Sequence, residues 1–515
     1  MPLSKTYNEI LDRKDNPELV LELLSFAGGE NTIGEDQELK TNEARTIENW
    51  DSISLGGMER SKGFTEVSDG GASYSTAPDG LFHHFEGSTV RNYVIIGGDL
   101  AYKNGSAITQ QTAGAFTSGT LCGGVSAGSS LWITNTTDNL KRATIAGGAV
   151  TPAGQPSSAR ERVYYHKSRL VAEGGGVTVY GSRASTGNWT AANAWSATGD
   201  AWNIDLPDLT KGCAPNFPSG NEILVFTEYQ AYSLYNFPNV AFRPIESSHG
   251  CSAPFSIAQG NQGVCFISKY PTLGVYLYDR VNFINLTINE DWIEDVDLTK
   301  RCFGVYRENT YHLFYNEIGS GVSYPNVWRI YDFSFGRWMK RPINASVSDT
   351  FGYPAVLHKS SNEFYIASSQ KDKLYQLEDT SNSDNTYSTE ATYTTKDFTS
   401  RDFGLERDEV RLKLLKMTVT YYGTTGNLTF NWIADRGLAT GSQTITISST
   451  GALVNTTFTI NTSSLSTPPP DKTLTQSFGN SAIGRRFNFQ IRNTGTSVRP
   501  KIKKIKIVAL ALDES

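Results

Sequence analysis

The sequence predicts an all-β protein that combines a β-propeller with a smaller β-sandwich. Strand and turn formers dominate the composition, because glycine accounts for 47 of 515 residues, aromatic residues for 11% and charged residues for only 19%. Short alternating segments recur in blocks of roughly 40 to 50 residues, the length of a propeller blade. A chain of 515 residues also exceeds one ordinary core, since domains tend to run about 100 to 200 residues.

Residues 1–45 are expected to form an N-terminal arm that precedes the first blade. Asn16 is a good helix cap and Pro17 suits the first helical position, which predicts a helix over residues 18–24. The same residues alternate between polar and apolar side chains. A strand therefore remains open as the alternative.

Residues 46–400 are expected to form the propeller, with roughly six to eight blades. The first clear unit joins residues 81–87 to residues 92–105, where Gly97, Gly98 and Asp99 provide the turn of a hairpin. Each unit pairs alternating strands across a polar turn. Comparable units follow at residues 125–145, 162–189, 221–237, 253–286, 302–343 and 354–379.

Residues 401–515 are expected to form the sandwich. Charged residues are frequent just after Phe398, and the chain beyond them is rich in threonine, with longer alternating segments. About six such segments predict a compact antiparallel β-sandwich. The run Pro468, Pro469 and Pro470 marks one of its loops.

Charge, hydropathy and cysteine content exclude several classes of protein. The 46 Lys and Arg residues against 52 Asp and Glu residues give a net charge of −6, which is too mild for a general binder of nucleic acid or anionic lipid. No apolar run approaches the roughly 18 residues of a membrane span, so no membrane insertion is expected. The five cysteines include no C-x-x-C pair, which predicts buried thiols in a reducing compartment rather than a zinc site or disulfides.

Sequence motifs for catalysis or cofactor binding are missing, so we expect no enzyme activity, no cofactor and no metal. Phosphate-binding loops, H-E-x-x-H and EF-hand sequences do not occur. Residues 124–128 match the G-x-S-x-G nucleophile motif around Ser126, but that motif requires a helix after the serine. Residues 129–135 predict a strand instead. We therefore interpret the match as a turn between two blade strands.

A carbohydrate-binding or carbohydrate-active propeller is the alternative function that the residues leave open. A glycosidase needs a pair of carboxylates across the sugar, which a sequence cannot exclude. The repeated Asp-box of sialidase-like propellers is absent, since residues 182–189 come nearest to it and have no aspartate at the turn. Trp189, Trp195 and Trp202 could stack on sugars, although such residues more often pack in a core.

A run of basic residues near the C-terminus contrasts with the acidic chain as a whole. One interpretation is contact with a phosphate backbone or an acidic partner. The other is an edge strand whose lysines prevent unwanted pairing. The candidate contact residues are Arg485, Arg486, Arg492, Arg499, Lys501, Lys503, Lys504 and Lys506.

Residues 24–64 contain a distinctive series of short motifs. An aromatic residue and a Gly-Gly-x-Asn start are followed by a leucine, an Asn-Glu-Ala stretch, an asparagine and Arg-x-x-Gly-Phe. The residues concerned are Phe26, Gly28, Gly29, Asn31, Leu39, Asn42, Glu43, Ala44, Asn49, Gly57, Arg60, Gly63 and Phe64. This series resembles the opening of phage tail hub or nozzle proteins. Segments 166–189, 221–236, 250–268 and 326–343 are similar to later blades, so the resemblance covers most of residues 24–400.

The resemblance implies a structural virion protein. The family includes the packaged-DNA stabilisation protein of short-tailed phages, whose copies form a ring, usually a hexamer, around the DNA exit channel below the portal. Implied partners are further copies of the chain, portal or adaptor ring proteins, other tail proteins, and double-stranded DNA that passes without sequence specificity. The implied location is the virion tail, after assembly in the host cytoplasm. The N-terminal arm would then dock on the neighbouring upstream ring.

Overall fold

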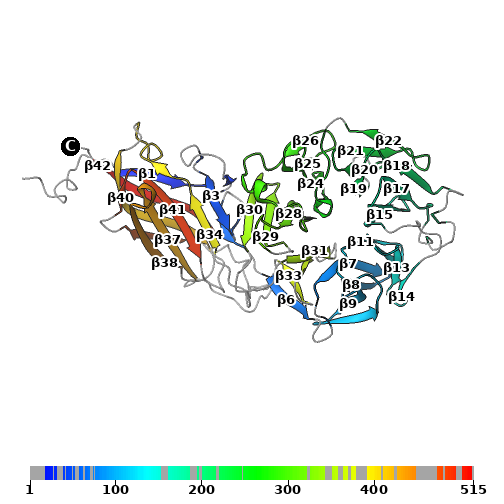
Figure 1. Cartoon of the computed structure of the whole chain (residues 1–515). Helices are drawn as coiled ribbons and strands as arrows, with labels where there is room; N and C mark the ends of the chain where they lie inside the picture. Colours follow the sequence, from blue (N-terminus) through cyan, green and yellow to red (C-terminus); the bar gives the residue numbers. More distant parts are fainter. Residues whose placement is uncertain are drawn as a thin grey trace, which may run out of the picture. The chain divides into compact units, whose positions relative to one another are not determined.

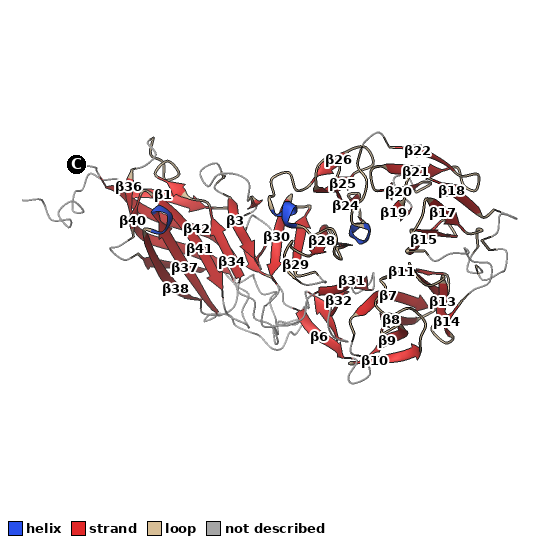
Figure 2. Cartoon of the chain, in the orientation of Figure 1, coloured by secondary structure: helices blue, strands red, loops and turns tan. Residues whose placement is uncertain are grey.

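Strands account for nearly all regular structure in the computed structural model, together with three short 3-10 helices among the described residues, η3 (Pro254–Ser256), η4 (Trp292–Asp295) and η5 (Asp435–Gly437) (Figure 2). The structure describes residues 18–26, 28–31, 39–40, 42–48, 50–52, 57–61, 64–69, 74, 76–151, 160–185, 189, 194–195, 200–215, 220–245, 248–321, 325–342, 351–357, 363–368, 373–377, 391–406, 410–422, 426–447, 472–478, 482–493 and 501–512. The prediction of an all-β protein is confirmed.

The chain divides into two units, which we describe separately. The propeller unit comprises Gly63–Ser334 and Arg341–Thr380, and the sandwich unit comprises Met1–Lys62, Phe335–Lys340 and Ser381–Ser515. The expected boundaries at residues 45/46 and 400/401 differ from this division. Strand pairing explains the difference, because β3 (Glu43–Glu48) pairs with β34 (Ala391–Thr395). The two ends of the expected propeller segment therefore meet in one sheet of the sandwich unit.

The propeller unit contains seven successive antiparallel blades among the described residues, and Figure 1 shows them around a common centre. The first three blades are β7 (Pro78–Glu86), β8 (Thr89–Ile96), β9 (Asp99–Asn104) and β10 (Ala107–Thr112); β11 (Cys122–Ala127), β12 (Ser130–Asn135), β13 (Lys141–Thr144) and β14 (Gly148–Val150); and β15 (Arg162–His166), β16 (Arg169–Glu173), β17 (Thr178–Gly181) and β18 (Trp202–Asp205).

The next two blades are β19 (Thr210–Pro215), β20 (Ile223–Thr227), β21 (Ala231–Tyr235) and β22 (Ala241–Pro244), followed by β23 (Ala258–Gln259), β24 (Val264–Ser268), β25 (Gly274–Tyr278) and β26 (Phe283–Asn285). The sixth blade contains β27 (Phe303–Arg307), β28 (Thr310–Tyr315) and β29 (Val327–Asp332). The next strand in sequence, β30 (Arg337–Pro342), is divided between the two units. The seventh blade consists of β31 (Phe351–Leu357), β32 (Glu363–Ser368), β33 (Lys373–Leu377) and β6 (Phe64–Asp69).

The propeller is closed by its own first strand. β6 pairs antiparallel with β33, from Phe64 opposite Leu377 to Asp69 opposite Lys373. The start of the unit thus completes the blade at its end. Innermost strands also meet across the closure, since β7 contacts both β11 and β31. The expected β-propeller, and a blade number within the expected range, are confirmed.

The hydrophobic cores of the propeller lie between successive blades. One cluster joins Tyr93 and Leu100 of the first blade to Leu131 and Ile133 of the second. Similar clusters join the second blade to the third, the third to the fourth, the fourth to the fifth, and the seventh to the first. Middle strands such as β12, β20 and β24 are buried on both faces, so they read as apolar runs rather than as simple alternation.

The sandwich unit is built from two sheets. The first has the order β39 (Lys472–Ser477), β36 (Arg411–Tyr422), β42 (Lys501–Leu512), β5 (Met58–Arg60) and β4 (Trp50–Ser52), with β1 (Glu18–Leu23) also paired to β42 and β40 (Ile483–Gly484) to β36. The second contains β3, β34, β41 (Arg486–Asn493), β37 (Gly426–Ala434) and β38 (Ala439–Ile447), with β2 (Gly29–Glu30) paired to β3 and β35 (Phe398–Thr399) to β41. The predicted sandwich is therefore larger than its expected sequence range.

The predicted helix over residues 18–24 is wrong, because residues 18–23 form strand β1. Its side chains alternate between exposed and buried positions, with Leu19, Leu21 and Leu23 in the core. Antiparallel pairing with β42 supplies the backbone hydrogen bonds of the strand. The described part of the expected arm is thus built into its own chain rather than left for a neighbouring ring. Residues 1–17 lie outside the described residues.

Candidate functional site

The innermost strands of the propeller approach one another closely where glycines replace side chains. A Cβ atom on Gly123 of β11 would lie 2.8 Å from the carbonyl oxygen of Glu161, and one on Gly304 of β27 would lie 2.0 Å from that of Ser256. A side chain at either position would require the backbone to move. Residues of β11, β15, β19, η3 and β27 enclose a cavity of about 270 Å³, which we call the axial cavity.

Arg162, the first residue of β15, is a buried cation in the wall of the axial cavity. Its side chain is 8% exposed, and Nη2 lies 3.5 Å from Oε1 of Glu161. The guanidinium carbon lies 4.2 Å from the centroid of the Phe255 ring. Nη1 donates a hydrogen bond to the carbonyl of Pro254. These contacts fix the position of the guanidinium group beside the cavity.

Glu173, the last residue of β16, is a fully buried carboxyl group near Arg162. The Tyr164 hydroxyl donates a hydrogen bond of 3.1 Å to its Oε1. Burial raises the pKa of Glu173 to about 7, against the opposing effect of the Arg162 charge. Among the described residues, the axis of the propeller thus contains a carboxyl group that exchanges its proton near neutral pH.

A second cavity, of about 370 Å³, shares Phe255 with the axial cavity and includes Arg301 in its wall. Nη2 of Arg301 donates a hydrogen bond of 3.2 Å to the carbonyl of Gly119 and lies 4.0 Å from Oδ1 of Asp79. Burial raises the pKa of Asp79, although the Gly119 N–H and the Arg301 charge oppose the shift. This arrangement ties the loop before the sixth blade to the first two blades.

The basic residues predicted as one contact face are distributed over both sheets of the sandwich. Lys501, Lys503, Lys504 and Lys506 belong to β42 of the first sheet, whereas Arg486 and Arg492 belong to β41 of the second. β41 buries every second side chain, and β42 buries Ile502, Ile505 and Ile507 around an irregularity at Lys503, so the basic residues of both strands stay partly exposed. The outer faces of two packed sheets point in opposite directions. Arg485 is exposed just before β41, and Arg499 lies outside the described residues.

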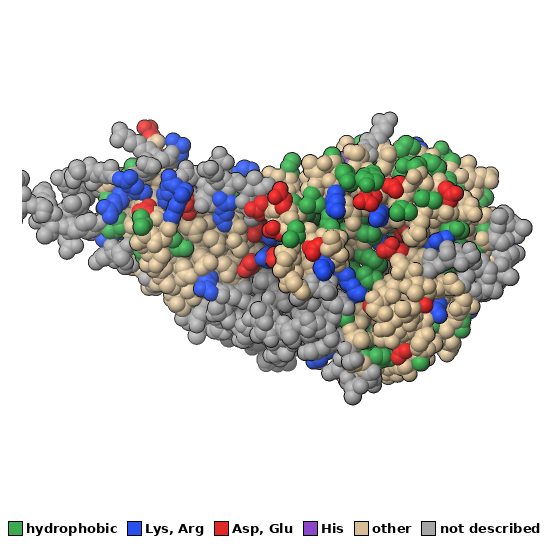
Figure 3. Space-filling view, viewed as in Figure 1, with side chains coloured by type: hydrophobic (Ala, Val, Ile, Leu, Met, Phe, Trp, Pro, Cys, Tyr) green, Lys and Arg blue, Asp and Glu red, His purple; other side chains and the backbone are tan. Residues whose placement is uncertain are grey.

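Strand β42 is not an edge strand, so the interpretation of its lysines as edge protection is wrong. β36 pairs along one side of β42, while β1 and β5 pair along the other. Acidic residues from distant parts of the sequence also reach these lysines. Lys501 lies 2.9 Å from Glu59, and Lys504 lies 2.8 Å from Glu22. Figure 3 shows Lys and Arg side chains over the sandwich strands.

The paired lysines are expected to contribute little to DNA binding. Each phosphate contact adds about 0.9 to the salt dependence of binding to duplex DNA, because counterions are released. Lys501 and Lys504 already have carboxylate partners. The double variant Lys501→Gln/Lys504→Gln should therefore keep the wild-type salt dependence of retention on immobilised duplex DNA. A decrease of nearly one unit per lysine would contradict this expectation.

Ser126 lies beside a histidine that sequence reasoning did not connect to it. His84 of β7 and Ser126 of β11 lie on adjacent innermost strands, with Nδ1 of the histidine 2.8 Å from the serine Oγ. Burial lowers the pKa of His84, which favours the neutral ring. Its Nε2 has no hydrogen-bond partner among the described residues. A hydrolytic triad would need a third group to orient the ring, so we interpret this pair as a structural contact.

Replacing Ser126 by alanine is expected to destabilise the propeller without removing a hydrolase activity. The variant removes the side-chain partner of Nδ1 in the buried His84, which costs on the order of 1 to 3 kcal/mol. Urea unfolding of the purified chain measures this loss. Ser129→Ala is the matched control, because Ser129 is exposed in the turn between β11 and β12. A loss of esterase activity in Ser126→Ala would contradict the structural interpretation.

The tryptophans considered for sugar stacking pack inside the propeller. Trp189 is 1% exposed and makes an edge-to-face contact with Trp132, with ring centroids 5.9 Å apart. Trp195 is partly buried against the same cluster, and Trp202 packs against Phe237. Burial of these rings agrees with the core interpretation and gives no support to a sugar-stacking site at this segment.

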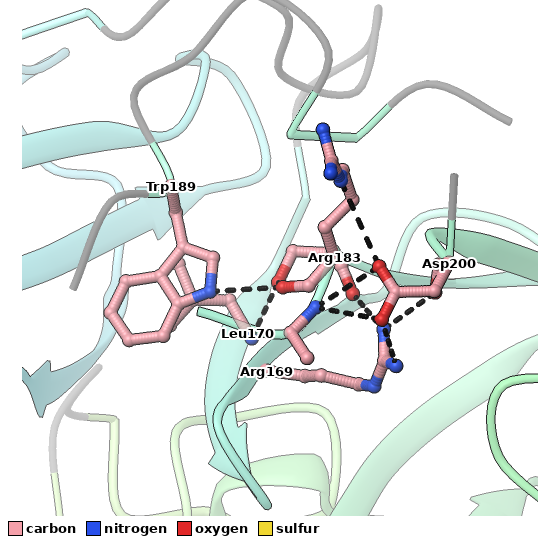
Figure 4. A network of polar contacts seen from close by, with 7 residues as sticks. Arg169, Leu170, Arg183, Trp189 and Asp200 are labelled. Atoms are coloured by element: carbon pink, nitrogen blue, oxygen red, sulfur yellow. Dashed lines mark hydrogen bonds and ion pairs between the residues drawn. The ribbon is translucent and has the colours of Figure 1, made fainter. Parts of the chain in front are cut away.

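A polar network holds the segment around Trp189 to the third blade (Figure 4). Arg169 places Nη2 2.6 Å from Oδ2 of Asp200 and donates a 2.8 Å hydrogen bond from Nη1 to the carbonyl of Ser182. The Trp189 indole N–H donates to the carbonyl of Arg183 at 3.1 Å. Partial burial acts to raise the pKa of Asp200, but the hydrogen bond and the charge of Arg169 outweigh this effect and lower the pKa. The described part of the segment nearest to an Asp-box, residues 182–185 and Trp189, therefore has a packing role.

Several residues that carry the tail-protein resemblance lie together at the start of the sandwich unit. The Gly28 N–H donates to the carbonyl of Asn42 at 2.9 Å, and a Cβ on Gly28 would lie 2.5 Å from that oxygen. The Asn31 N–H donates to the carbonyl of Ala44 at 2.9 Å, and its amide donates to Glu43 at 3.3 Å.

The other residues of that resemblance are dispersed. Phe26 is buried and packs edge-to-face on Tyr393, with centroids 5.3 Å apart. Leu39 and Gly57 are buried, Gly29 lies in β2, Arg60 in β5, and Phe64 begins β6. Asn49 and Gly63 lie outside the described residues.

The described residues contain neither a cluster of metal ligands nor a membrane-spanning helix. No cluster of three or more His, Cys, Asp or Glu side chains there could hold a metal ion. In the same part of the chain, no helix has the length and apolar character needed to span a membrane. All five cysteines are free and buried, as the sequence predicted.

Comparison with known proteins gives structural similarity only. No protein-family model and no curated protein matches the sequence. The WD40 domain of Neurospora crassa Pan2 is similar at 8% identity and a TM-score of 0.39, covering 64% of this chain and 98% of that one. A chain of the mitotic checkpoint complex shows 8% identity, a TM-score of 0.37 and coverages of 62% and 94%. The computationally designed Ika8 protein shows 10% identity, a TM-score of 0.37 and coverages of 61% and 100%.

Proposed function

We propose that this chain is a structural, non-catalytic subunit of a phage tail hub or nozzle ring. In this role, copies of the chain surround the DNA exit channel below the portal or adaptor, help retain packaged DNA and guide its ejection. The observation that carries the proposal is the element formed by Gly28, Asn31, Asn42, Glu43 and Ala44. These residues of the resemblance are joined by hydrogen bonds and one close backbone approach, so the identities of Gly28, Asn31 and Glu43 serve a local structure to which Asn42 and Ala44 contribute backbone carbonyls.

The construction of the propeller also suits a ring subunit. Closure by β6 links the first and last blades through backbone hydrogen bonds, so the unit cannot open at that seam without losing a strand pair. The mild net charge of −6 limits attraction to passing DNA. Rings require a heterologous interface that closes on itself, and a hexamer is the number implied by the resemblance.

Exposed apolar side chains on one face of the propeller are the proposed contact between copies. Successive strands of a blade run in opposite directions, so alternate turns lie on opposite faces of a propeller. Tyr229 and Tyr270 lie in corresponding turns of adjacent blades, 52% and 38% exposed, with ring centroids 5.0 Å apart. Leu209, 51% exposed, lies on the same face in the connection between the third and fourth blades. Contiguous apolar groups of this kind mark association surfaces.

Mass photometry of the purified chain tests the proposal. The wild-type chain should form closed oligomers of one size, and the double variant Leu209→Ser/Tyr229→Ser should be monomeric. Val281→Ser is the matched control, because Val281 is 79% exposed in a turn on the opposite face. A wild-type chain that stays monomeric at micromolar concentration, or that binds glycans in an array, would favour the carbohydrate alternative.

A further inference from the structure

One edge of the Arg162 guanidinium has no hydrogen-bond partner although the residue is buried. Nη1 is occupied by the carbonyl of Pro254, but neither Nε nor Nη2 makes a hydrogen bond to a described residue. A buried polar group left unpaired costs about 1 to 3 kcal/mol, and a charged group costs more. The described residues therefore leave this edge of the guanidinium group without a hydrogen-bond acceptor.

The unpaired donors have the geometry that recognises a carboxylate. Nε–H and one Nη2–H point in the same direction from the planar group and form a fork that matches the two oxygens of a carboxylate. Glu173, the cross-strand partner of Arg162, accepts a hydrogen bond from Tyr164, and Glu161 forms an ion pair in which its Oε1 lies 3.5 Å from Nη2. That separation exceeds the usual range of a charge-assisted hydrogen bond, about 2.7 to 2.9 Å. Glu161 thus balances the charge without filling the fork.

Apolar side chains form part of the remaining wall of the axial cavity. Phe255 stacks on the guanidinium, and Val125, Val163 and Ile257 line the same space. The cavity volume of about 270 Å³ lies just below the roughly 300 to 1,000 Å³ of sites for drug-sized ligands. Tyr165, which also lines the cavity, is 37% exposed, so the cavity wall reaches solvent there. This lining suits a ligand with a compact apolar body.

We propose that the axial cavity binds a small carboxylate with an apolar body. Its two oxygens accept hydrogen bonds from Nε and Nη2 of Arg162, and its body packs against Phe255 and Ile257. The inference rests on the geometry of the propeller unit alone and does not depend on a role in a phage tail. It adds a small-molecule site to a domain otherwise proposed to be structural.

Benzoate and benzamide are the probes for this site. They share a ring and a planar head group, but only benzoate offers two charged acceptor oxygens. Calorimetric titration of the full-length chain should give saturable binding of benzoate and at least tenfold weaker binding of benzamide. Inorganic phosphate should bind at least tenfold more weakly than benzoate, because it has no apolar body. Equal binding of benzoate and benzamide, or no benzoate binding at millimolar concentration, would overturn the proposal.

Variants of the cavity locate the bound probe. Arg162→Lys keeps the charge but removes the fork, so benzoate affinity should fall at least tenfold. Val125→Phe fills the cavity without altering Arg162 and should abolish binding, whereas Val150→Phe, on the exposed last strand of the second blade, should not. Glu161→Gln removes a nearby negative charge and should strengthen binding. Benzoate affinity that is the same in Val125→Phe and Glu161→Gln as in the wild type would refute the site even if Arg162→Lys fails to fold.

Discussion

Replacing Leu21 by alanine is expected to weaken the sandwich unit by about 2 to 5 kcal/mol, the usual cost of deleting a buried leucine side chain. Leu21 is 3% exposed in β1 and lies opposite Ile507 of β42. Loss of its packing should therefore destabilise both strands of this pair. Hydrogen exchange measured by mass spectrometry should show faster exchange in peptides that cover residues 501–512.

Val20 provides the matched control on the same strand. Its side chain is 38% exposed and points to the other face of β1, so Val20→Ala should change the free energy of unfolding by less than about 0.5 kcal/mol. If residues 18–23 were instead a free arm for a neighbouring ring, Leu21→Ala would leave exchange in β42 unchanged. That result would contradict the assignment of β1 to the sandwich.

Replacing Glu173 by glutamine is expected to stabilise the propeller at alkaline pH. Burial raises the pKa of Glu173 from 4.5 to about 7 in the folded chain. Between these values the folded state holds more protons than the unfolded state, so stability falls as pH rises from about 4.5 to 7 and then levels off. The glutamine variant removes this loss, which at 1.36 kcal/mol per pKa unit is on the order of 3 kcal/mol at pH 8.

Urea unfolding at pH 5 and pH 8 measures the effect of Glu173→Gln. The variant and the wild type should be similar at pH 5, and the variant should be the more stable at pH 8. Glu228→Gln is the control, since this half-exposed residue pairs with Lys211 at the surface and contributes at most about 1 kcal/mol. A variant less stable than the wild type at pH 8 would mean that Glu173 is held there as a favourable charge.

Local sequence patterns predicted the repeated part of the fold well. Each hairpin within a blade joins neighbouring strands, so turn residues such as Gly97 and Gly98 and the apolar runs around them were sufficient. The interpretation of residues 124–128 as a turn was only partly right, because Ser126 belongs to β11 and pairs with Leu131 of β12, and the turn itself begins at Gly128. The strand after it excluded the helix that a nucleophile motif requires.

Pairing between distant segments could not be predicted from those patterns. Residues 18–23 fit a helix and a strand almost equally until β42 is available as a partner. The lysines of β42 formed a cluster without acids in the sequence, yet Glu22 and Glu59 reach them through strand pairing. The closure of the last blade by β6 is of the same kind.

The axial site was missed for a related reason. Arg162 and Glu173 stand at the far ends of one hairpin, where charged residues ordinarily indicate exposure. Only the assembled ring of inner strands buries them together. A charged residue that begins or ends an otherwise apolar blade strand is the single sequence signal that could have pointed to this site.

Localisation of the chain on phage particles tests the proposed function most directly. Gold-labelled antibodies against the full-length chain, applied to virions purified from a culture that expresses it, should mark the tail end beneath the portal, with a fixed number of copies per particle by quantitative mass spectrometry. Particles without the label, together with recovery of the chain only in the fraction free of virions, would contradict a role as a tail ring subunit.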